Sequence, residues 1–305
     1  MNLEVTLEFG KRNQYMYRFK LYNIMPANNP ISKTELRELV LSWQILDAVS
    51  LALEDKRALF LILELAGEDD ETTRLRAFVA LGEILKRADS DLRMMVLEGH
   101  LDVFTDALSL KNEKVTIKAL RALGYLVEGI PLESKAFLKA AKALVSLLGS
   151  SDDVMKIEAI DVLSKLRPLE DSKLVRAYIN ELVASPNPYT KVTGFYLFLN
   201  VLNSSADSGS LTRILDEIPP LLQNDNEFIV ELTLDVLEKA LSFPLPEDVK
   251  TELLEISRVV NGLVYREGAP VIRLKAKRVS NLIDSIVSVQ PQLFADFKTP
   301  TGNTQ

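Results

Sequence analysis

The sequence predicts an all-α fold in which about six helix pairs stack in a row as a right-handed α-solenoid. Three observations support this prediction. Apolar residues recur at helical spacing through most of the chain, the helical segments come in pairs bounded by glycine or proline, and one pattern within the pairs returns at a nearly constant interval. Because one helix pair cannot bury its own apolar stripe, neighbouring pairs must cover one another.

The composition limits both fold and function. With 305 residues, of which 47% are hydrophobic and 26% charged, the chain can form a large core. The absence of cysteine excludes disulfides, zinc thiolate sites and cysteine nucleophiles, and a single histidine excludes imidazole metal clusters. We therefore expect no metal, cofactor or small-molecule substrate. The net charge of -7 disfavours nucleic acid and anionic membranes on average, although a local basic patch can still bind.

No segment has the features of a signal peptide or a membrane helix. Glu4 and Glu8 stand where a signal peptide needs an apolar core, and the longest apolar run, Ala58 to Leu63, is far shorter than the roughly 20 residues of a membrane span. We expect a cytoplasmic protein without membrane contact.

Two segments are expected to precede the repeats. In residues 1–30, alternating apolar residues on both sides of a turn predict a β-hairpin and linker, which either caps the solenoid or pairs with another chain. In residues 31–52, Ser32 and Glu35 form a capping box that begins one amphipathic capping helix. Trp43, the single tryptophan, lies on its apolar stripe, so we expect it in the core, with stacking on a ligand as the alternative.

The repeats are expected to occupy residues 53–288. The predicted helix pairs are 55–66 with 71–87, 90–110 with 113–128, 133–148 with 153–167, 172–184 with 188–203, 210–223 with 227–242, and 247–264 with 270–288. Each second helix follows a residue at the same place in the pattern: Asp70, Asn112, Asp152, Asn187, Asn226 and Ala269. All but the last can cap the helix by accepting from free backbone amides, and the intervals between them are 42, 40, 35, 39 and 43 residues.

A small residue follows each of these positions by seven residues. They are Ala77, Ala119, Ala159, Gly194, Thr233 and Ala276. A small side chain at a fixed place allows two helix axes to approach within roughly 8 to 10 Å.

The first three repeats resemble the HEAT and armadillo families. The segment from Asp70, DETTRLRAFVALG, is similar to the second helix of a HEAT repeat, and Val96 to Val127 resembles an armadillo repeat with a glycine, Gly99, between its first two helices. The resemblance covers roughly Leu53 to Val287. It implies that the second helices line a concave binding surface.

One arc of the second helices is the candidate partner-binding surface. Positions two, six, nine and thirteen residues after the cap lie on it, and it is the inner face or partly a face between repeats. The candidate site residues are Arg76, Lys114, Lys118, Arg121, Tyr125, Tyr196, Asn200, Lys275 and Arg278. Armadillo peptide receptors resemble one another in a Trp and an Asn four residues apart on this surface, and Tyr196 with Asn200 comes nearest to that pair.

Charge on these helices is segregated. Repeats two and six carry basic clusters, and repeat five between them is acidic. Three interpretations remain open: a solvated face, a binding surface, or an ion-pair ladder of the HEAT type, for which Asp70 with Arg74, Asp152 with Lys156 and Asn187 with Lys191 are the expected pairs.

Enzymatic function is not expected. The HEAT-repeat hydroxylases hold iron with several histidines, and the HEAT-like DNA glycosylases use a strongly basic concave face, neither of which this chain has. The C-terminal tail, residues 289–305, is expected to cover the open end of the last repeat. We expect a non-catalytic scaffold or adaptor that binds another protein. The alternative is a nucleic-acid-binding protein that uses the basic clusters of repeats two and six.

Overall fold

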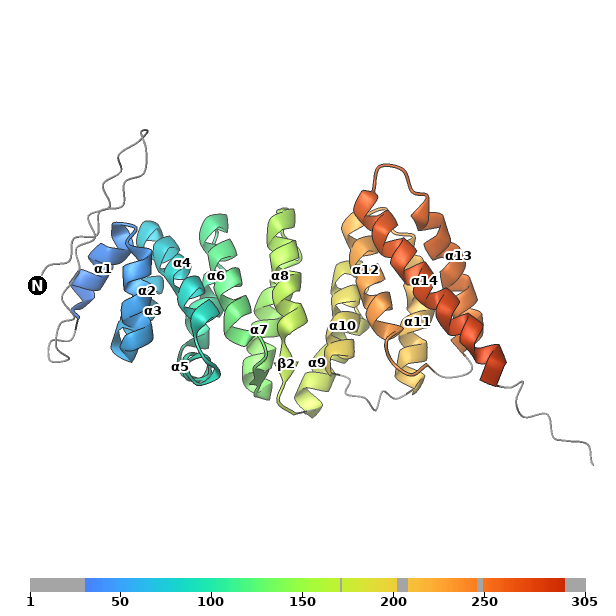
Figure 1. Ribbon diagram of the computed structural model, residues 1–305, viewed down its shortest axis with the longest axis horizontal. Coiled ribbons are helices and arrows are strands. Elements are labelled where there is room, and N and C mark those ends of the chain that lie inside the picture. The colour runs from blue at the N-terminus through green and yellow to red at the C-terminus, as the bar shows by residue number, and fades with distance from the viewer. Residues whose placement is uncertain (1–30, 171, 202–207, 246–248, 294–305) are drawn as a thin grey trace, which may run out of the picture.

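The chain folds into a row of helices that follow one another along the long axis of the molecule (Figure 1). The computed structural model describes residues 31–170, 172–201, 208–245 and 249–293. The predicted β-hairpin of residues 1–30 and the tail beyond residue 293 lie outside these ranges. In the described part, the prediction of an all-α solenoid built from helix pairs is confirmed.

The pairs alternate a first and a second helix. The first helices are α3 (Lys56–Ala66), α5 (Ser90–Ala107), α7 (Ser134–Leu147), α9 (Lys173–Val183), α11 (Ser208–Leu222) and α13 (Lys250–Val264). The second helices are α4 (Glu71–Arg87), α6 (Glu113–Val127), α8 (Asp153–Lys165), α10 (Pro188–Val201), α12 (Glu227–Ala240) and α14 (Pro270–Leu293). Each second helix contacts its neighbours in the row, and the contact between α8 and α10 is the sparsest of these. Aromatic side chains join repeats in the core: Phe78 and Phe104 are buried with ring centroids 5.9 Å apart.

The predicted caps begin the second helices. The side chain of Asp70 accepts from the amide of Thr73, and that of Asn112 accepts from Val115. Asp152, Asn187 and Asn226 cap α8, α10 and α12 in the same way. Five caps at one place in the pattern fix where each second helix starts, and therefore set the register of neighbouring pairs.

The small residues lie where helices approach one another. The five with a side chain are fully buried: Ala77, Ala119, Ala159, Thr233 and Ala276 lie at 2% exposure or less. At Gly194 the approach is closest, because an added Cβ would lie 2.7 Å from the amide nitrogen of Val183 in α9. No residue with a side chain fits there without movement of the backbone.

The predicted single capping helix is wrong. The segment forms two helices, α1 (Lys33–Leu41) with the expected capping box at Ser32, and α2 (Ile45–Glu54). Between them the backbone reverses at Trp43, which has a positive φ of 61°. Positive φ is uncommon for a bulky residue, and this turn carries the indole out of the core: Trp43 is 57% exposed. The expectation that it packs inside is therefore also wrong.

The helix break expected at Gly99 lies one residue further on. Helix α5 is interrupted at His100, where the backbone leaves helical geometry and the ring packs on Phe60 with centroids 5.2 Å apart. One local feature was not expected from the sequence. The turns after α6 and α8 form a parallel pair of two-residue strands, β1 (Pro131–Leu132) and β2 (Arg167–Pro168). This pairing fastens the turn after repeat two to the turn after repeat three.

Candidate partner-binding face

The predicted site residues all lie on the second helices. We call the exposed surface of these helices the second-helix face. What this face can bind depends on its exposed side chains, on the charges that are not yet paired and on the apolar groups that lack cover. These properties differ between the first three repeats and the last three.

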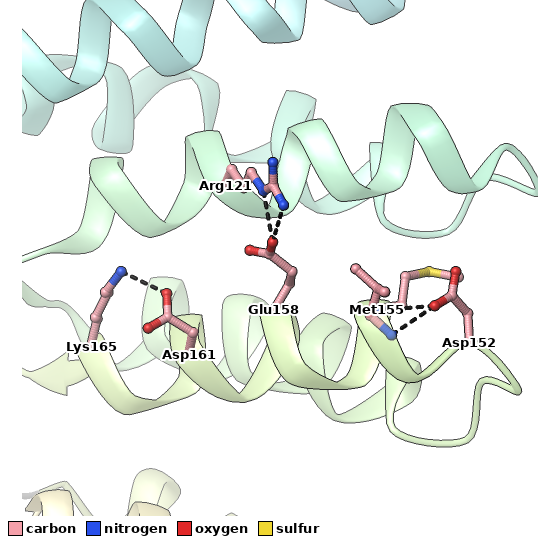
Figure 2. Close-up of polar contacts among 7 residues, drawn as sticks. Arg121, Asp152, Met155, Glu158, Asp161 and Lys165 are labelled. Atoms are coloured by element: carbon pink, nitrogen blue, oxygen red, sulfur yellow. Dashed lines mark hydrogen bonds and ion pairs between the residues drawn. The ribbon is translucent and has the colours of Figure 1, made fainter.

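At the centre of the row, α6 and α8 are joined by an ion pair. The guanidinium of Arg121 donates to one carboxylate oxygen of Glu158, with Nε 2.7 Å away (Figure 2). This hydrogen bond with Glu158 raises the pKa of Arg121 above its ordinary value. On α8 itself Lys165 pairs with Asp161 at 2.7 Å, as Figure 2 also shows. Both acids on this part of the face are therefore neutralised by cations of the same chain.

The lysines beside this ion pair are not neutralised in the same way. Lys114 is exposed and Lys118 is half-buried, and within the described ranges neither has an ion pair or a side-chain hydrogen bond. Lys111, in the turn before α6, is exposed and equally unpaired there. The predicted basic cluster of repeat two, Lys114, Lys118 and Arg121, thus leaves two ammonium groups available, and Lys111 outside that cluster adds a third.

Two exposed apolar side chains lie on α8, the helix that packs beside α6, and the sequence reasoning missed them. Val154 is 49% exposed and Ile157 is 56% exposed, both on α8. Their spacing of three residues places them on one side of the helix. The signal was present in the sequence, since Val154 occupies the second position after the cap Asp152, where Lys114 stands in repeat two.

Arg76 and Tyr125 are less available than expected. The guanidinium of Arg76 donates to the carbonyl of Leu41 and lies 4.9 Å from the centre of the Trp43 ring, so it joins α4 to the turn between α1 and α2. Tyr125 is half-buried, and its carbonyl accepts from Arg93 of α5 at 3.0 Å. Both residues help to hold the repeats together.

The Tyr196 and Asn200 pair does not form the expected exposed patch. Asn200 is 8% exposed, and its amide nitrogen lies 3.4 Å from the carbonyl of Leu163 and 3.3 Å from that of Ser164, at the end of α8. It therefore belongs to the contact between repeats. Tyr196 is half-buried under Lys239, whose amine lies 5.2 Å from the ring centre, and burial raises the pKa of Tyr196.

Two of the four cations in the basic cluster of repeat six, which are Arg273, Lys275, Lys277 and Arg278, are paired with acids of repeat five, while Arg273 and Lys277 are exposed and have no ion pair among the described residues. Lys275 lies 2.8 Å from both Glu231 and Asp235 on α12, and Arg278 lies 3.4 Å from Glu238. Burial lowers the pKa of Lys275, but its hydrogen bonds to Asp235 and Glu231 outweigh this and leave the pKa above its ordinary value. Acids of repeat five and cations of repeat six thus form ion pairs across the contact between α12 and α14.

The expected ion-pair ladder exists with different members. Arg74 pairs with Asp69 at 3.8 Å, Lys156 pairs with Asp153 at 2.9 Å, and Lys191 pairs with Glu217. None of the three cations uses the cap residue that we expected. The rungs that connect second helices are instead Arg121 with Glu158 and the Lys275 and Arg278 pairs.

Among the residues that the structure describes, no group of three or more His, Cys, Asp or Glu side chains could hold a metal ion. The same part of the chain contains no helix that is long and apolar enough to span a membrane.

Comparison with known proteins identifies the family. The chain is 85% identical to an archaeal HEAT-like repeats protein from Thermococcus onnurineus NA1, over 85% of this chain and 100% of that one, with a TM-score of 0.70. The chain belongs to the HEAT-like repeat proteins. An engineered protein (18% identity, 73% of this chain and 95% of that one, TM-score 0.44) and a designed armadillo repeat protein (13% identity, 73% and 98%, TM-score 0.43) are similar at greater distance.

No family model matches the sequence, and no curated protein does. The HEAT-like assignment therefore rests on the archaeal structure and agrees with the helix pairs described above.

Proposed function

We propose that this HEAT-like protein is a non-catalytic, cytoplasmic scaffold or adaptor that binds another protein along its second-helix face. The observation that carries the proposal is the exposed surface over α6 and α8, where unpaired lysines stand beside uncovered apolar side chains at the middle of the row. An elongated stack of this kind offers an extended face in place of an enclosed pocket. The residues proposed to contact the partner are Lys114, Lys118 and Arg121, whereas Arg76, Tyr125 and Tyr196 are engaged in contacts between helices and are not part of this surface.

Nucleic acid is the second candidate, and the structure supports it less. It would need the basic clusters of α6 and α14 to contact one phosphate backbone. Lys275 and Arg278 already face the carboxylates of α12, so an approaching phosphate would meet Glu231, Asp235 and Glu238 as well. Binding that depended on both clusters would also weaken steeply as salt rises.

The proposed function is tested by capture of partners with the full chain in extracts of its source organism after mild crosslinking. A variant with Lys114→Glu and Lys118→Glu is compared with a control that carries the same charge change on first helices, Lys56→Glu and Lys135→Glu, at two exposed lysines. We expect one protein to be enriched by the wild type and by the control, and lost with the α6 variant.

Two results would contradict the proposal. The chain could be recovered alone under all conditions, which opposes a scaffold role. Alternatively, it could shift DNA or RNA in a gel at low salt and lose this binding when either basic cluster is reversed, which supports the nucleic-acid alternative.

A further inference from the structure

The surface over α6 and α8 also indicates the chemistry of the partner. The acidic side chains at its centre have ion-pair partners within the chain, whereas its lysines have none. Glu158 is held by Arg121 and Asp161 by Lys165. Lys111, Lys114 and Lys118 have no acid within bonding distance in the described structure. This part of the face therefore has positive charge available for a partner's carboxylates.

Two further acids near the start of α6 have favourable places of their own. Glu113 lies in the first turn of α6, where the helix dipole favours a negative charge. Glu71 occupies the first turn of α4, and its carboxylate accepts from the side chain of Asn112 at 2.8 Å. Neither is paired with Lys114 or Lys118.

The register between α6 and α8 puts the two apolar residues at the level of Lys118 along the neighbouring helix. Arg121 and Glu158, which face each other, are 37 residues apart. The same spacing from Lys118 falls at Met155, between Val154 and Ile157. Because α6 and α8 are neighbours in the stack, the two apolar side chains lie at the level of Lys118, with Lys114 two turns before Arg121 on the same helix.

This arrangement discriminates between classes of partner. A nucleic-acid backbone would pair with the lysines, but its phosphates offer no apolar group to cover Val154 and Ile157. A neutral apolar segment would cover Ile157 but would remove Lys118 from water without a counter-charge, which is unfavourable. An acidic segment with apolar side chains at intervals satisfies both requirements.

We propose that the face over α6 and α8 binds an acidic protein segment whose apolar side chains cover Val154 and Ile157 and whose carboxylates pair with Lys114 and Lys118. The inference rests on the proposed scaffold function and specifies its partner. The apolar contacts supply most of the affinity, and the lysines set orientation and association rate and reject basic segments.

The test uses the full chain and three labelled synthetic peptides of equal length in fluorescence anisotropy. One peptide contains Glu and Leu, the second contains Glu and Ser, and the third contains Lys and Leu. We expect the Glu and Leu peptide to bind at least about tenfold more tightly than either of the others, a difference of roughly 1.4 kcal/mol. Two variants, Lys114→Glu with Lys118→Glu and Val154→Ser with Ile157→Ser, should each weaken binding by about tenfold or more.

The control variant Lys56→Glu with Lys135→Glu should bind the Glu and Leu peptide as the wild type does. All substituted side chains are at least partly exposed, and circular dichroism checks that each variant folds. The inference is overturned if the Lys and Leu peptide binds equally well, or if reversal of the α6 lysines leaves affinity unchanged. It is also overturned if the Glu and Ser peptide and duplex DNA bind as tightly as the Glu and Leu peptide, because the face would then be a general polyanion site. A partner captured from extracts would leave the scaffold proposal intact in each of these cases.

Discussion

The basic clusters of α6 and α14 look alike in sequence and differ in the structure. On α14, Lys275 and Arg278 pair with acids on α12 and so join the last two repeats, while Arg273 and Lys277 are exposed and have no ion pair in the described structure. On α6, Arg121 alone has such a partner, while Lys114 and Lys118 remain available. The difference teaches that a charged cluster on a repeat protein is defined by the neighbouring repeat as much as by its own helix.

The helix contacts differ between the two halves as well. In the first three repeats the small position holds alanine, whereas in repeat four it holds Gly194. Gly82, which lies within α4 in the first half, has nothing within 4 Å of an added Cβ. Of these two glycines, only Gly194 is required by a close approach of two helices. A side chain at position 82 would meet no neighbouring atom.

The largest expected effect comes from exchanging these glycines for alanine. Gly194→Ala would place a Cβ 2.7 Å from the backbone of α9, and we expect a loss of about 3 kcal/mol in the free energy of unfolding. Gly82→Ala should gain up to about 1 kcal/mol, because alanine favours a helix interior. Urea denaturation of both variants measures the contrast, and equal effects of the two substitutions would mean that α9 and α10 are not in close contact.

A smaller effect separates the two basic clusters. Lys275→Met leaves Glu231 and Asp235 facing each other without a cation, and we expect a loss of about 1 to 2 kcal/mol, allowing for partial exposure. Lys118→Met breaks no ion pair and should change stability by less than about 0.5 kcal/mol. Thermal unfolding of the two variants tests this. A comparable loss at Lys118 would show that the α6 cluster is also structural.

The smallest effect is a pH dependence in the second half. Burial, with a smaller contribution from Arg167, lowers the pKa of Lys239 to about 8 from an ordinary value of 10.5. Between these values the unfolded chain keeps a proton that the folded chain has lost. The free energy of unfolding therefore rises with pH between these two values. Below pH 8 the folded chain bears the full cost of burying the charged amine of Lys239.

The variant Lys239→Arg isolates this contribution, because arginine stays charged throughout. Relative to that variant, the wild type should become more stable as pH rises from 8 to 10, by less than about 1 kcal/mol after solvent screening. Denaturation at a series of pH values measures the difference. A flat difference curve would show that Lys239 is solvated like an ordinary surface lysine.

The helix pairs could be predicted from the sequence because their signals are local. Caps such as Asp70 and Asn112 lie next to the helices that they begin, and Ala77 and Ala119 lie within one stripe. The reversal at Trp43 could not be predicted in this way. The apolar spacing through Val40, Trp43 and Leu46 suits one continuous helix, and the turn depends on a positive φ that is uncommon for tryptophan.

The candidate site was harder to predict, because its properties arise between repeats. Lys275 forms a hydrogen bond with Asp235, which is 40 residues away in the sequence. Asn200 forms one with Leu163 at the end of α8, which is 37 residues away. Patterns of three and four residues along one helix contain no information about these partners. The exposure of Ile157 likewise depends on how α8 is placed against α6 and α10.

The strand pair β1 and β2 has a mechanical consequence. The amide of Leu169 donates to the carbonyl of Leu132 at 2.7 Å, and the hydroxyls of Ser134 and Ser172 lie 2.7 Å apart, so the two turns are linked at both backbone and side chain. Repeat three is therefore bridged at its two boundary turns by hydrogen bonds that do not depend on helix packing. The junction of α8 with α10 has fewer helix contacts than the other junctions between second helices, so we expect local opening to begin there.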